Sequence, residues 1–239
     1  MRALCLIMLA ATAAHAQDNL MPRQGSGWAG FKVGTKVRVK RTFLGAGRTP
    51  AVTITTMTLK SIQGAVLTLA IVSKNAVGMD RKSTRPVPRK GEAGAGETAE
   101  VKKLKNKASF AAGKQFDCAR RQTTVVGKAY KRVITEWTSV TKPRMRVKRV
   151  ELQYDAAGKV TQRFSMVLAE MAKEHKVGKR KVTGLKYTTV RTAGNVRTTS
   201  TAIVSRDVPG YEVLVDAEVE MNGKKVQTVR VEVLDFETK

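Results

Sequence analysis

The sequence has few of the side chains that most catalytic and metal-binding sites require. Its 239 residues include only two histidines and two cysteines. One of each, His15 and Cys5, lies in an N-terminal stretch that we expect to be removed, which leaves His175 and Cys118. A zinc site needs about three or four His, Cys or carboxylate ligands, and a cysteine nucleophile needs a nearby base. We therefore expect no metal site, no cofactor and no intramolecular disulfide.

Enzyme motifs are missing as well. The G-x-S-x-G nucleophile elbow does not occur in the sequence. A pair of carboxylates, as in glycosidases, stays open, because Glu136, Glu151 or Asp155 could meet in space. A carboxylate on a strand is, however, far more often a solvated surface group. The sequence therefore favours a protein that is not an enzyme.

Long hydrophobic runs are scarce. Beyond residue 16 the longest is 65–72, which is too short for a membrane-spanning helix, so we do not expect an integral membrane protein. The first 16 residues combine Arg2, a short apolar stretch and the sequence Ala14-His15-Ala16, which are the features of a secretory signal peptide. We expect cleavage after Ala16 and a secreted or periplasmic protein.

Acidic residues are also few, whereas basic residues are abundant. The chain has 45 Lys and Arg against 19 Asp and Glu, a net charge of +26 and a pI near 10.5. Such a surface attracts polyanions through counterion release, without reading a sequence. Aromatic residues make up only 5% and are scattered, so single-stranded nucleic acid is not favoured. The candidate polyanion-binding residues are Arg81, Lys82, Arg85, Arg89, Lys90, Lys102, Lys103, Lys105, Arg144, Arg146, Lys148 and Arg149.

Two functions remain open for such a chain. The first is a non-enzymatic secreted or periplasmic envelope protein whose basic surface contacts anionic polymers or lipid headgroups. The second is a carrier of an apolar or lipid ligand in a concave β interior, by analogy with lipoprotein carriers of similar architecture. An enclosed apolar pocket would favour the carrier. If neither holds, the charge serves only to keep the protein in solution.

The pattern of apolar residues predicts strands almost throughout. After the signal peptide (1–16) we expect a flexible mature N-terminus over 17–27 and a three-stranded meander over 28–78. A stretch rich in Pro, Gly and basic residues, 79–107, is typical of an exposed loop. The stretch 169–176, AEMAKEHK, is the best local candidate for a helix.

The second half of the chain repeats. Residues 113–125 match 178–190 at Gly, Lys, Thr, Thr and Val, and Ser139 and Pro143 later fall on Ser205 and Pro209. Each copy, 108–171 and 172–239, reads as four strands. We expect an all-β, antiparallel fold of about eleven strands: a curved sheet or half-barrel with an internal duplication of a four-stranded unit.

Short motifs add a resemblance. The stretch 27–37 resembles the opening W-A-x-F-x-x-G-S-W-V phrase of a group of uncharacterised secreted bacterial proteins common in Planctomycetes, with Thr35 and Lys36 where Ser and Trp are usual. Residues 113–118 are similar to their later G-K-x-F-x-C, and 207–210 to their V-P-G turn. The resemblance implies secretion and a β-rich fold, and it implies no activity.

Overall fold

The protein is built from one continuous antiparallel β-sheet. The computed structural model describes residues 26–64, 66–75, 78, 80–88, 97–141 and 144–239. The expected signal peptide and its cleavage site, and residues 17–25 of the expected N-terminus, lie outside these residues. The first element is a short 3-10 turn, η1 (Ser26–Trp28). The strands are β1 (Lys36–Gly45), β2 (Ala51–Gln63), β3 (Val66–Asn75), β4 (Asp80–Pro88), β5 (Thr98–Ala111), β6 (Lys114–Val126), β7 (Tyr130–Ser139), β8 (Arg146–Asp155), β9 (Val160–Val177), β10 (Arg180–Ala193), β11 (Val196–Val204), β12 (Glu212–Met221) and β13 (Lys224–Glu237).

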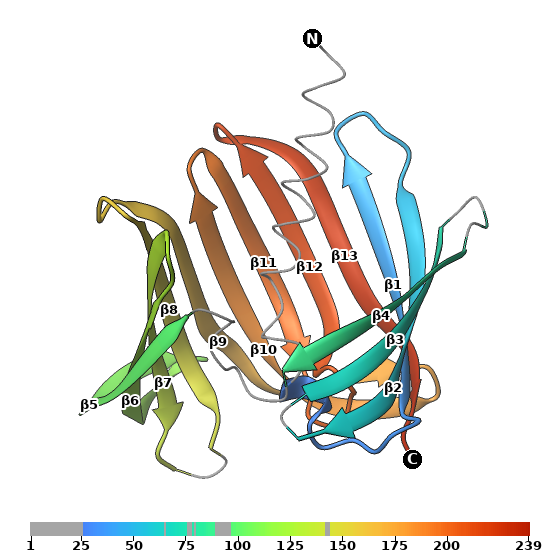
Figure 1. The fold of residues 1–239 in the computed structure, drawn as a ribbon, viewed down its shortest axis with the longest axis horizontal. Coiled ribbons are helices and arrows are strands. Elements are labelled where there is room, and N and C mark those ends of the chain that lie inside the picture. Colours follow the sequence, from blue (N-terminus) through green and yellow to red (C-terminus); the bar gives the residue numbers. More distant parts are fainter. Residues whose placement is uncertain (1–25, 65, 76–77, 79, 89–96, 142–143) are drawn as a thin grey trace.

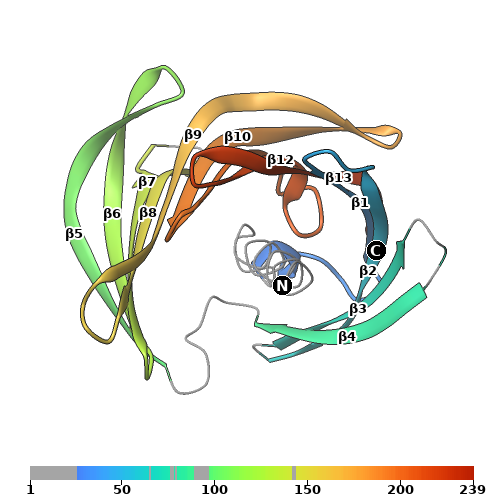
Figure 2. The same cartoon turned by 90° about the horizontal axis from the view of Figure 1, so that it is seen from above.

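The strands form a meander in which the first strand, β1, also pairs with the last, β13. Strands next to each other in sequence pair with each other, except β4 and β5, so the order runs β4-β3-β2-β1-β13-β12 and on to β5. Among the described strands, β4 and β5 form the two edges of an unclosed sheet (Figure 1). Seen from above, the sheet curls into a C-shaped trough (Figure 2). The all-β antiparallel, curved expectation is confirmed, with thirteen described strands in place of eleven.

Irregular pairing bends the sheet. The register shifts between Arg38 and Val39, between Leu59 and Ser61, between Trp137 and Thr138, and at further points along β9 and β12. A bulge of this kind inserts an unpaired residue, bends its strand and increases the local twist. The curvature of the trough follows from these breaks.

The duplication stays a prediction, and the strands of the two proposed copies follow the same order and share local features. β6–β9 and β10–β13 are both four-stranded antiparallel units in the same order. The second strand of each has a register shift at its end, after Trp137 in one and after Ile203 in the other. Just beyond, Ser139 N donates to Met145 O at 3.0 Å, and Ser205 N to Tyr211 O at 2.7 Å. The two residues that the sequence aligned therefore occupy equivalent places.

Two sequence expectations were wrong. The stretch 79–107 is not one loop, because most of it forms β4 and β5, the two edge strands; its residues 89–96 lie outside the described part. The stretch 169–176 is not a helix but the end of β9, which pairs with β10 from Glu170 to Val177. In addition, Ser26 and Gly27 belong to η1 and are not a flexible tail.

One end of the trough is filled by an apolar core. Figure 2 shows η1 and the loop between β11 and β12 inside the curve of the sheet. Trp28 is 1% exposed and Val208 is fully buried, and both pack against Val39 and Val213 from the sheet. The two inserted segments touch through glycines: Gly210 N donates to Gly27 O at 3.0 Å, and a Cβ on Gly27 would lie 2.7 Å from the Gly210 carbonyl carbon.

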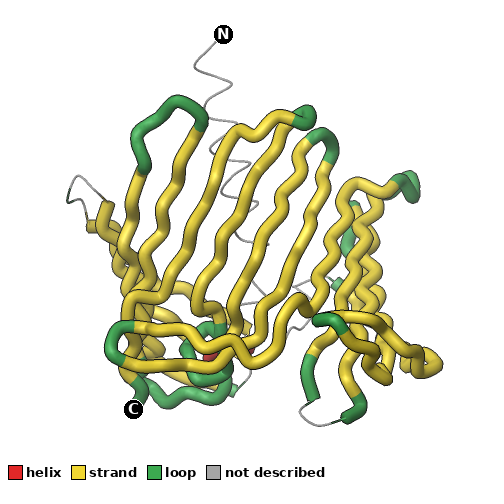
Figure 3. Tube along the Cα trace, turned by 180° about the vertical axis from the view of Figure 1, so that it is seen from behind, coloured by secondary structure: helices red, strands yellow, loops and turns green. Residues whose placement is uncertain are grey.

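A second, smaller core supports the other end. Phe116, Cys118, Val147, Leu168 and Tyr187 are buried together there. Cys118 is fully buried on β6, and burial, followed by the charge of Asp117, raises the pKa of its thiol. From behind, the long β9–β10 hairpin turns across the sheet near the C-terminus (Figure 3). There the Arg180 guanidinium lies 4.8 Å from the centre of the Phe236 ring.

Candidate functional site: an arginine cluster on the concave face

The concave face can be followed from strand to strand through the pairing register. Directly paired residues of antiparallel strands point to the same side of a sheet. Val39 packs against Trp28 inside the trough, and Phe43 lies on the same side of β1 because side chains alternate. The row of pairs that starts at Phe43 continues through Val229, Ala217, Ser200, Thr189, Met166, Arg149, Glu136, Arg121 and Lys103.

This face changes character along the row. Its middle, at Ala217, Ser200 and Thr189, is small and buried, and the Thr189 and Ser200 hydroxyls lie 2.6 Å apart. Beyond β9 it becomes strongly charged. We define the arginine cluster as five arginines with two glutamates between them, contributed by strands β6 to β10: Arg121, Arg132, Arg146, Arg149, Arg191, Glu136 and Glu151.

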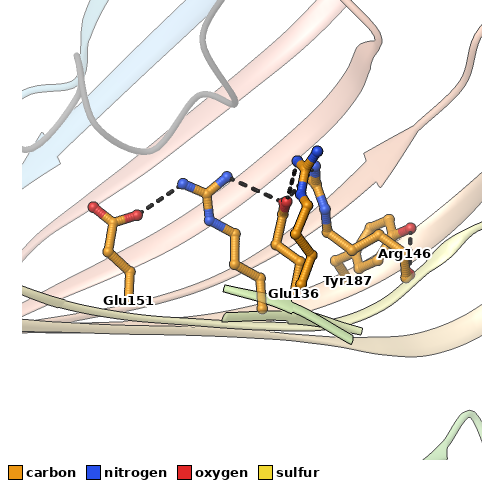
Figure 4. Close-up of polar contacts among 6 residues, drawn as sticks. Glu136, Arg146, Glu151 and Tyr187 are labelled. Carbon is orange, nitrogen blue, oxygen red and sulfur yellow. Dashed lines mark hydrogen bonds and ion pairs between the residues drawn. The ribbon is translucent and has the colours of Figure 1, made fainter. Parts of the chain in front are cut away.

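Glu136 is the most deeply buried charge of the cluster. Its side chain is about 10% exposed. Arg121 NH2 donates to its carboxylate at 2.9 Å, Arg146 NH2 lies 2.8 Å away, and Arg149 NH1 lies 3.7 Å away (Figure 4). Burial would raise the pKa of Glu136, but the charge of Arg146, the hydrogen bond from Arg121 and the charge of Arg149 together lower it. Glu136 is therefore ionised at neutral pH.

Arg149 joins the two glutamates. Its NH2 donates to Glu151 at 2.8 Å, while Arg132 Nε lies 3.7 Å from the same carboxylate. The guanidinium carbon of Arg149 lies 6.0 Å from the centre of the Phe164 ring, and that of Arg191 lies 5.5 Å from it. Cations stack favourably on an aromatic face. The Phe164 ring thus holds two positively charged guanidinium groups, those of Arg149 and Arg191, close to each other.

The charges of the cluster do not cancel. Five guanidinium groups face two carboxylates, so the formal net charge is +3. Burial lowers the pKa of Arg191; the carboxylate of Glu151 acts against this, and Arg149 and Arg132 lower the pKa further. Within the described residues, the buried Nε atoms of Arg132 and Arg149 have no hydrogen-bond acceptor. The cluster therefore has positive charge left for an anion, which would bind the exposed parts of the guanidinium groups rather than these buried Nε atoms.

Backbone contacts hold the cluster in place. Tyr187 donates from its hydroxyl to the carbonyl of Arg146 at 3.0 Å, and burial raises the pKa of this phenol. Ser139, at the end of β7, donates from its hydroxyl to Thr141 O at 2.7 Å. The second contact supports the end of β7 and the first supports the start of β8, so Arg146 enters the cluster from a supported strand end.

The outer face carries a different pattern. On β12, β13 and β1 the acidic residues of the C-terminal region are paired with basic neighbours. Arg230 lies 3.4 Å from Asp216 and 3.6 Å from Glu232, and Lys40 lies 3.2 Å from Glu232. These exposed ladders are nearly neutral, so the surplus of positive charge on the described residues lies elsewhere.

The residues that the sequence proposed for polyanion binding are not one site. Arg146 and Arg149 lie in the arginine cluster, but Lys148 points to the opposite face, 5.3 Å from the Trp137 ring. The others are placed as follows: Arg81, Lys82 and Arg85 on edge strand β4; Lys102, Lys103 and Lys105 on edge strand β5; Arg144 in the exposed connection before β8; Arg89 and Lys90 outside the described residues.

Three arginines of the cluster were missed. Arg121, Arg132 and Arg191 lie on β6, β7 and β10, far from one another in sequence. The search for basic runs could not find them, since only the register brings them together. The repeat gave no signal either, because it aligns Arg121 with Lys186 and Arg191 with Val126.

The carboxylates that stayed open as a catalytic pair have other partners. Glu136 and Glu151 are both bound by Arg149, and Asp155 accepts backbone hydrogen bonds from Ala157 and Lys159 in a turn. A general acid needs a raised pKa, whereas the pKa of Glu136 is lowered. Across the described ranges, no group of three or more His, Cys, Asp or Glu side chains comes together as a metal site would require.

A second polar spot lies at the apolar end of the trough. Glu212 and Arg41 line a small hollow of about 30 Å³ beside Trp28, Met57 and Val231. That volume holds about one water molecule. Gly210 and Tyr211, with φ of 86° and 68°, make the turn that delivers Glu212 to this place.

This partly buried residue predicts a pH dependence of stability. Burial raises the pKa of Glu212 to about 7, against the charge of Arg41, from an ordinary value of 4.5. Its contribution to folding is therefore full below pH 4.5 and is lost as the pH rises through 7. Glu212→Gln should be more stable than the wild type by about 1–2 kcal/mol at pH 8. Urea unfolding of both proteins at pH 5 and pH 8 measures this, and an equal difference at both pH values would contradict it.

The fold and the site define a class: an all-β protein made of one curved antiparallel sheet with an arginine-rich concave face. No protein-family model matches the chain, and no curated protein is similar to it in sequence. In the described part of the chain, no helix has the length and apolarity to cross a membrane.

Two solved structures are similar in outline. The first is a "putative exported protein with YmcC-like fold" from Bacteroides fragilis, with 7% identity over 87% of this chain and 97% of that one, at a TM-score of 0.38. The second is a "putative lipoprotein" from Parabacteroides distasonis, with 10% identity over 91% and 97%, at a TM-score of 0.35. Likeness at this level carries no argument about function. Both organisms lie outside the Planctomycetes, so that part of the resemblance stays an expectation.

Proposed function

We propose that the protein is a non-enzymatic envelope protein, exported by its N-terminal signal, that binds anionic polymers or lipid headgroups. The observation that carries the proposal is the arginine cluster: five guanidinium groups and two carboxylates on one concave face. Arginine presents a planar fork of donors that suits phosphate and carboxylate oxygens. The exposed basic edges β4 and β5 add a diffuse attraction around the mouth of the trough.

The carrier of an apolar ligand ranks second. Such a ligand would need an apolar pocket of several hundred Å³. The apolar end of the trough is instead packed by Trp28 and Val208, and the hollow beside them has about 30 Å³. Two larger hollows, of about 530 and 650 Å³, are open and lined in part by charged side chains, Arg38 and Asp235 in one and Asp216 and Arg230 in the other. The polar end presents charge rather than an apolar wall. These features favour an anion over an acyl chain.

Salt titration tests the proposal. Binding of the protein to long-chain polyphosphate should weaken about a hundredfold between about 50 and 200 mM salt, if some five phosphates are neutralised. Glutamine at Arg121 and Arg191 should weaken binding and flatten the salt dependence. Glutamine at the edge residues Arg81, Lys82 and Arg85 should have a smaller effect, because the edge attracts without enclosing the ligand.

Two outcomes would count against this. If the edge substitutions abolish binding and the cluster substitutions do not, the binding surface is the sheet edge. If the wild-type protein binds neither polyphosphate nor anionic vesicles at low salt, the charge has no binding role. Fluorescence anisotropy with labelled polyphosphate gives the affinities directly.

A further inference from the structure

The arginine cluster contains a more specific arrangement than a basic surface. Arg149 and Arg191 both lie against the ring of Phe164, and Arg132 lies beside them through its contact with Glu151. Phe164 and Glu151 are direct partners across β8 and β9, and Phe164 and Arg191 across β9 and β10. Two guanidinium groups, those of Arg149 and Arg191, thus lie against one aromatic ring. Arg132 and Arg149 both contact the carboxylate of Glu151, while Glu136 is bound more closely by Arg121 and Arg146.

Such a group of like charges costs free energy when it is partly buried. Side chains of Arg132 and Arg149 are 18% and 23% exposed. Their Nε atoms are buried, and among the described residues they find no hydrogen-bond acceptor. A buried donor without an acceptor is unfavourable, and so is an uncompensated charge. An anion does not reach the buried Nε atoms, but one that binds the exposed parts of these side chains would relieve the cost of the like charges.

The number and position of the donors limit the kind of anion. Guanidinium groups on three different strands, β7, β8 and β10, approach from different directions, which suits a tetrahedral anion better than a flat carboxylate. The surplus of +3 in the whole cluster favours a dianion over a monoanion, because the Coulomb energy grows with the charge in a site shielded from water. A phosphate monoester has both properties: three free oxygens and a charge near −2 at neutral pH.

We propose that Arg132, Arg149 and Arg191 form a binding site for a phosphate monoester group, with Phe164 as the platform that orders the guanidinium groups. The proposal rests on the proposed function and deepens it, since it names the chemical group that the anionic ligand presents. Two sources share this chemistry: the terminal phosphate of a lipid headgroup, and the phosphate of a soluble sugar or polymer end.

The test uses small probes, so that diffuse attraction to a polymer does not interfere. Methyl phosphate and dimethyl phosphate are titrated into the protein by calorimetry at pH 7.5 and constant ionic strength. Methyl phosphate should bind one to one, and dimethyl phosphate, with one charge and two free oxygens, at least about tenfold more weakly. At pH 5 the affinity for methyl phosphate should fall, because the ester takes up a proton near pH 6 while arginine stays charged.

Variants locate the site. Arg149→Lys and Arg191→Lys keep the positive charge but lose the planar set of guanidinium donors. Each should weaken the binding of methyl phosphate about tenfold or more. Arg230→Lys is the matched control, because Arg230 is also paired with two carboxylates but lies on the outer face; its affinity should equal that of the wild type. Circular dichroism confirms that each variant is folded, and the lysine retains a cation beside Glu136 and Glu151.

The outcomes separate this site from the general proposal. If polyphosphate binds with a steep salt dependence but methyl phosphate does not bind, the phosphate site is wrong and the proposed function stands. If methyl phosphate and dimethyl phosphate bind equally, or Arg149→Lys and Arg191→Lys bind as well as the control, the site is also overturned. Vesicles of phosphatidylcholine with phosphatidate or with phosphatidylglycerol then distinguish the source: retention on phosphatidate alone supports a lipid monoester, and binding of the soluble ester without vesicle retention supports a soluble one.

Discussion

Trp28→Ala should cost about 3–5 kcal/mol of the free energy of unfolding, since truncation of a fully buried tryptophan removes its transfer free energy and leaves a cavity. Trp28 is 1% exposed and lies inside the trough between η1 and the sheet. Its ring meets Phe31 edge-on at 6.5 Å, and its carbonyl accepts the Phe31 amide at 3.0 Å. Removing the ring leaves both η1 and the β11–β12 loop without the surface they share.

Urea unfolding followed by far-UV circular dichroism measures the effect. The matched control is Trp137→Ala, the other tryptophan of the chain. Trp137 lies on the outer face between Arg120 and Lys148, whose charged groups are 5.5 and 5.3 Å from its ring, and it is only partly buried. Its loss should cost clearly less. Equal losses would mean that the apolar end of the trough is not the main core.

The sequence predicts well those strands that have one buried face and one exposed face. On β1 the buried residues Val37 and Val39 alternate with exposed ones, and on β12 so do Val213, Val215 and Ala217 with more exposed neighbours. Period two is visible there because one face is covered by the core. The same reasoning predicts the four strands of the second repeat at about 181–191, 195–204, 211–220 and 224–236, each within two residues of the observed bounds.

The sequence did not predict the edge strands or the end of β9 as strands, and there is a physical reason for this. Edge strands commonly carry Lys and Pro, which discourage pairing with another chain, and β4 ends in Arg85-Pro86-Val87-Pro88 while β5 contains Lys102 and Lys103. The same residues are typical of loops. In β9 the residues Ala, Glu and Lys favour a helix locally, but pairing with β10 decides the conformation.

The functional face could not be derived from the sequence. Side chains of residues next to each other in a strand point to opposite faces, and the pairing register brings residues that are distant in sequence onto the same face. Lys148 and Arg149 are adjacent in the chain, yet one stacks on Trp137 on the outer face and the other binds Glu136 on the concave face. Arg121 reaches the same carboxylate from β6. The register between the strands is fixed by turns and bulges, and no single segment encodes it.

Glu136→Gln should destabilise the protein by about 3 kcal/mol at pH 7, because breaking a buried ion pair leaves its partners uncompensated. Gln has nearly the same shape and keeps one acceptor oxygen, so the change tests charge rather than packing. Arg121 and Arg146 would then lose the charged partner that they contact, and the formal charge of the cluster would rise from +3 to +4.

The loss should depend on pH in a defined direction. The folded protein lowers the pKa of Glu136, so its ionised form stabilises the fold above the ordinary pKa of about 4.5, and this contribution is lost as the pH falls through the lowered pKa. Urea unfolding should therefore show a large difference between wild type and Glu136→Gln at pH 7 and a smaller one at pH 3. The control is Glu237→Gln, whose carboxylate is 77% exposed and 3.9 Å from Lys36; such surface pairs contribute little. A pH-independent loss in Glu136→Gln would mean that Glu136 acts through packing, and the arginines would not need its charge.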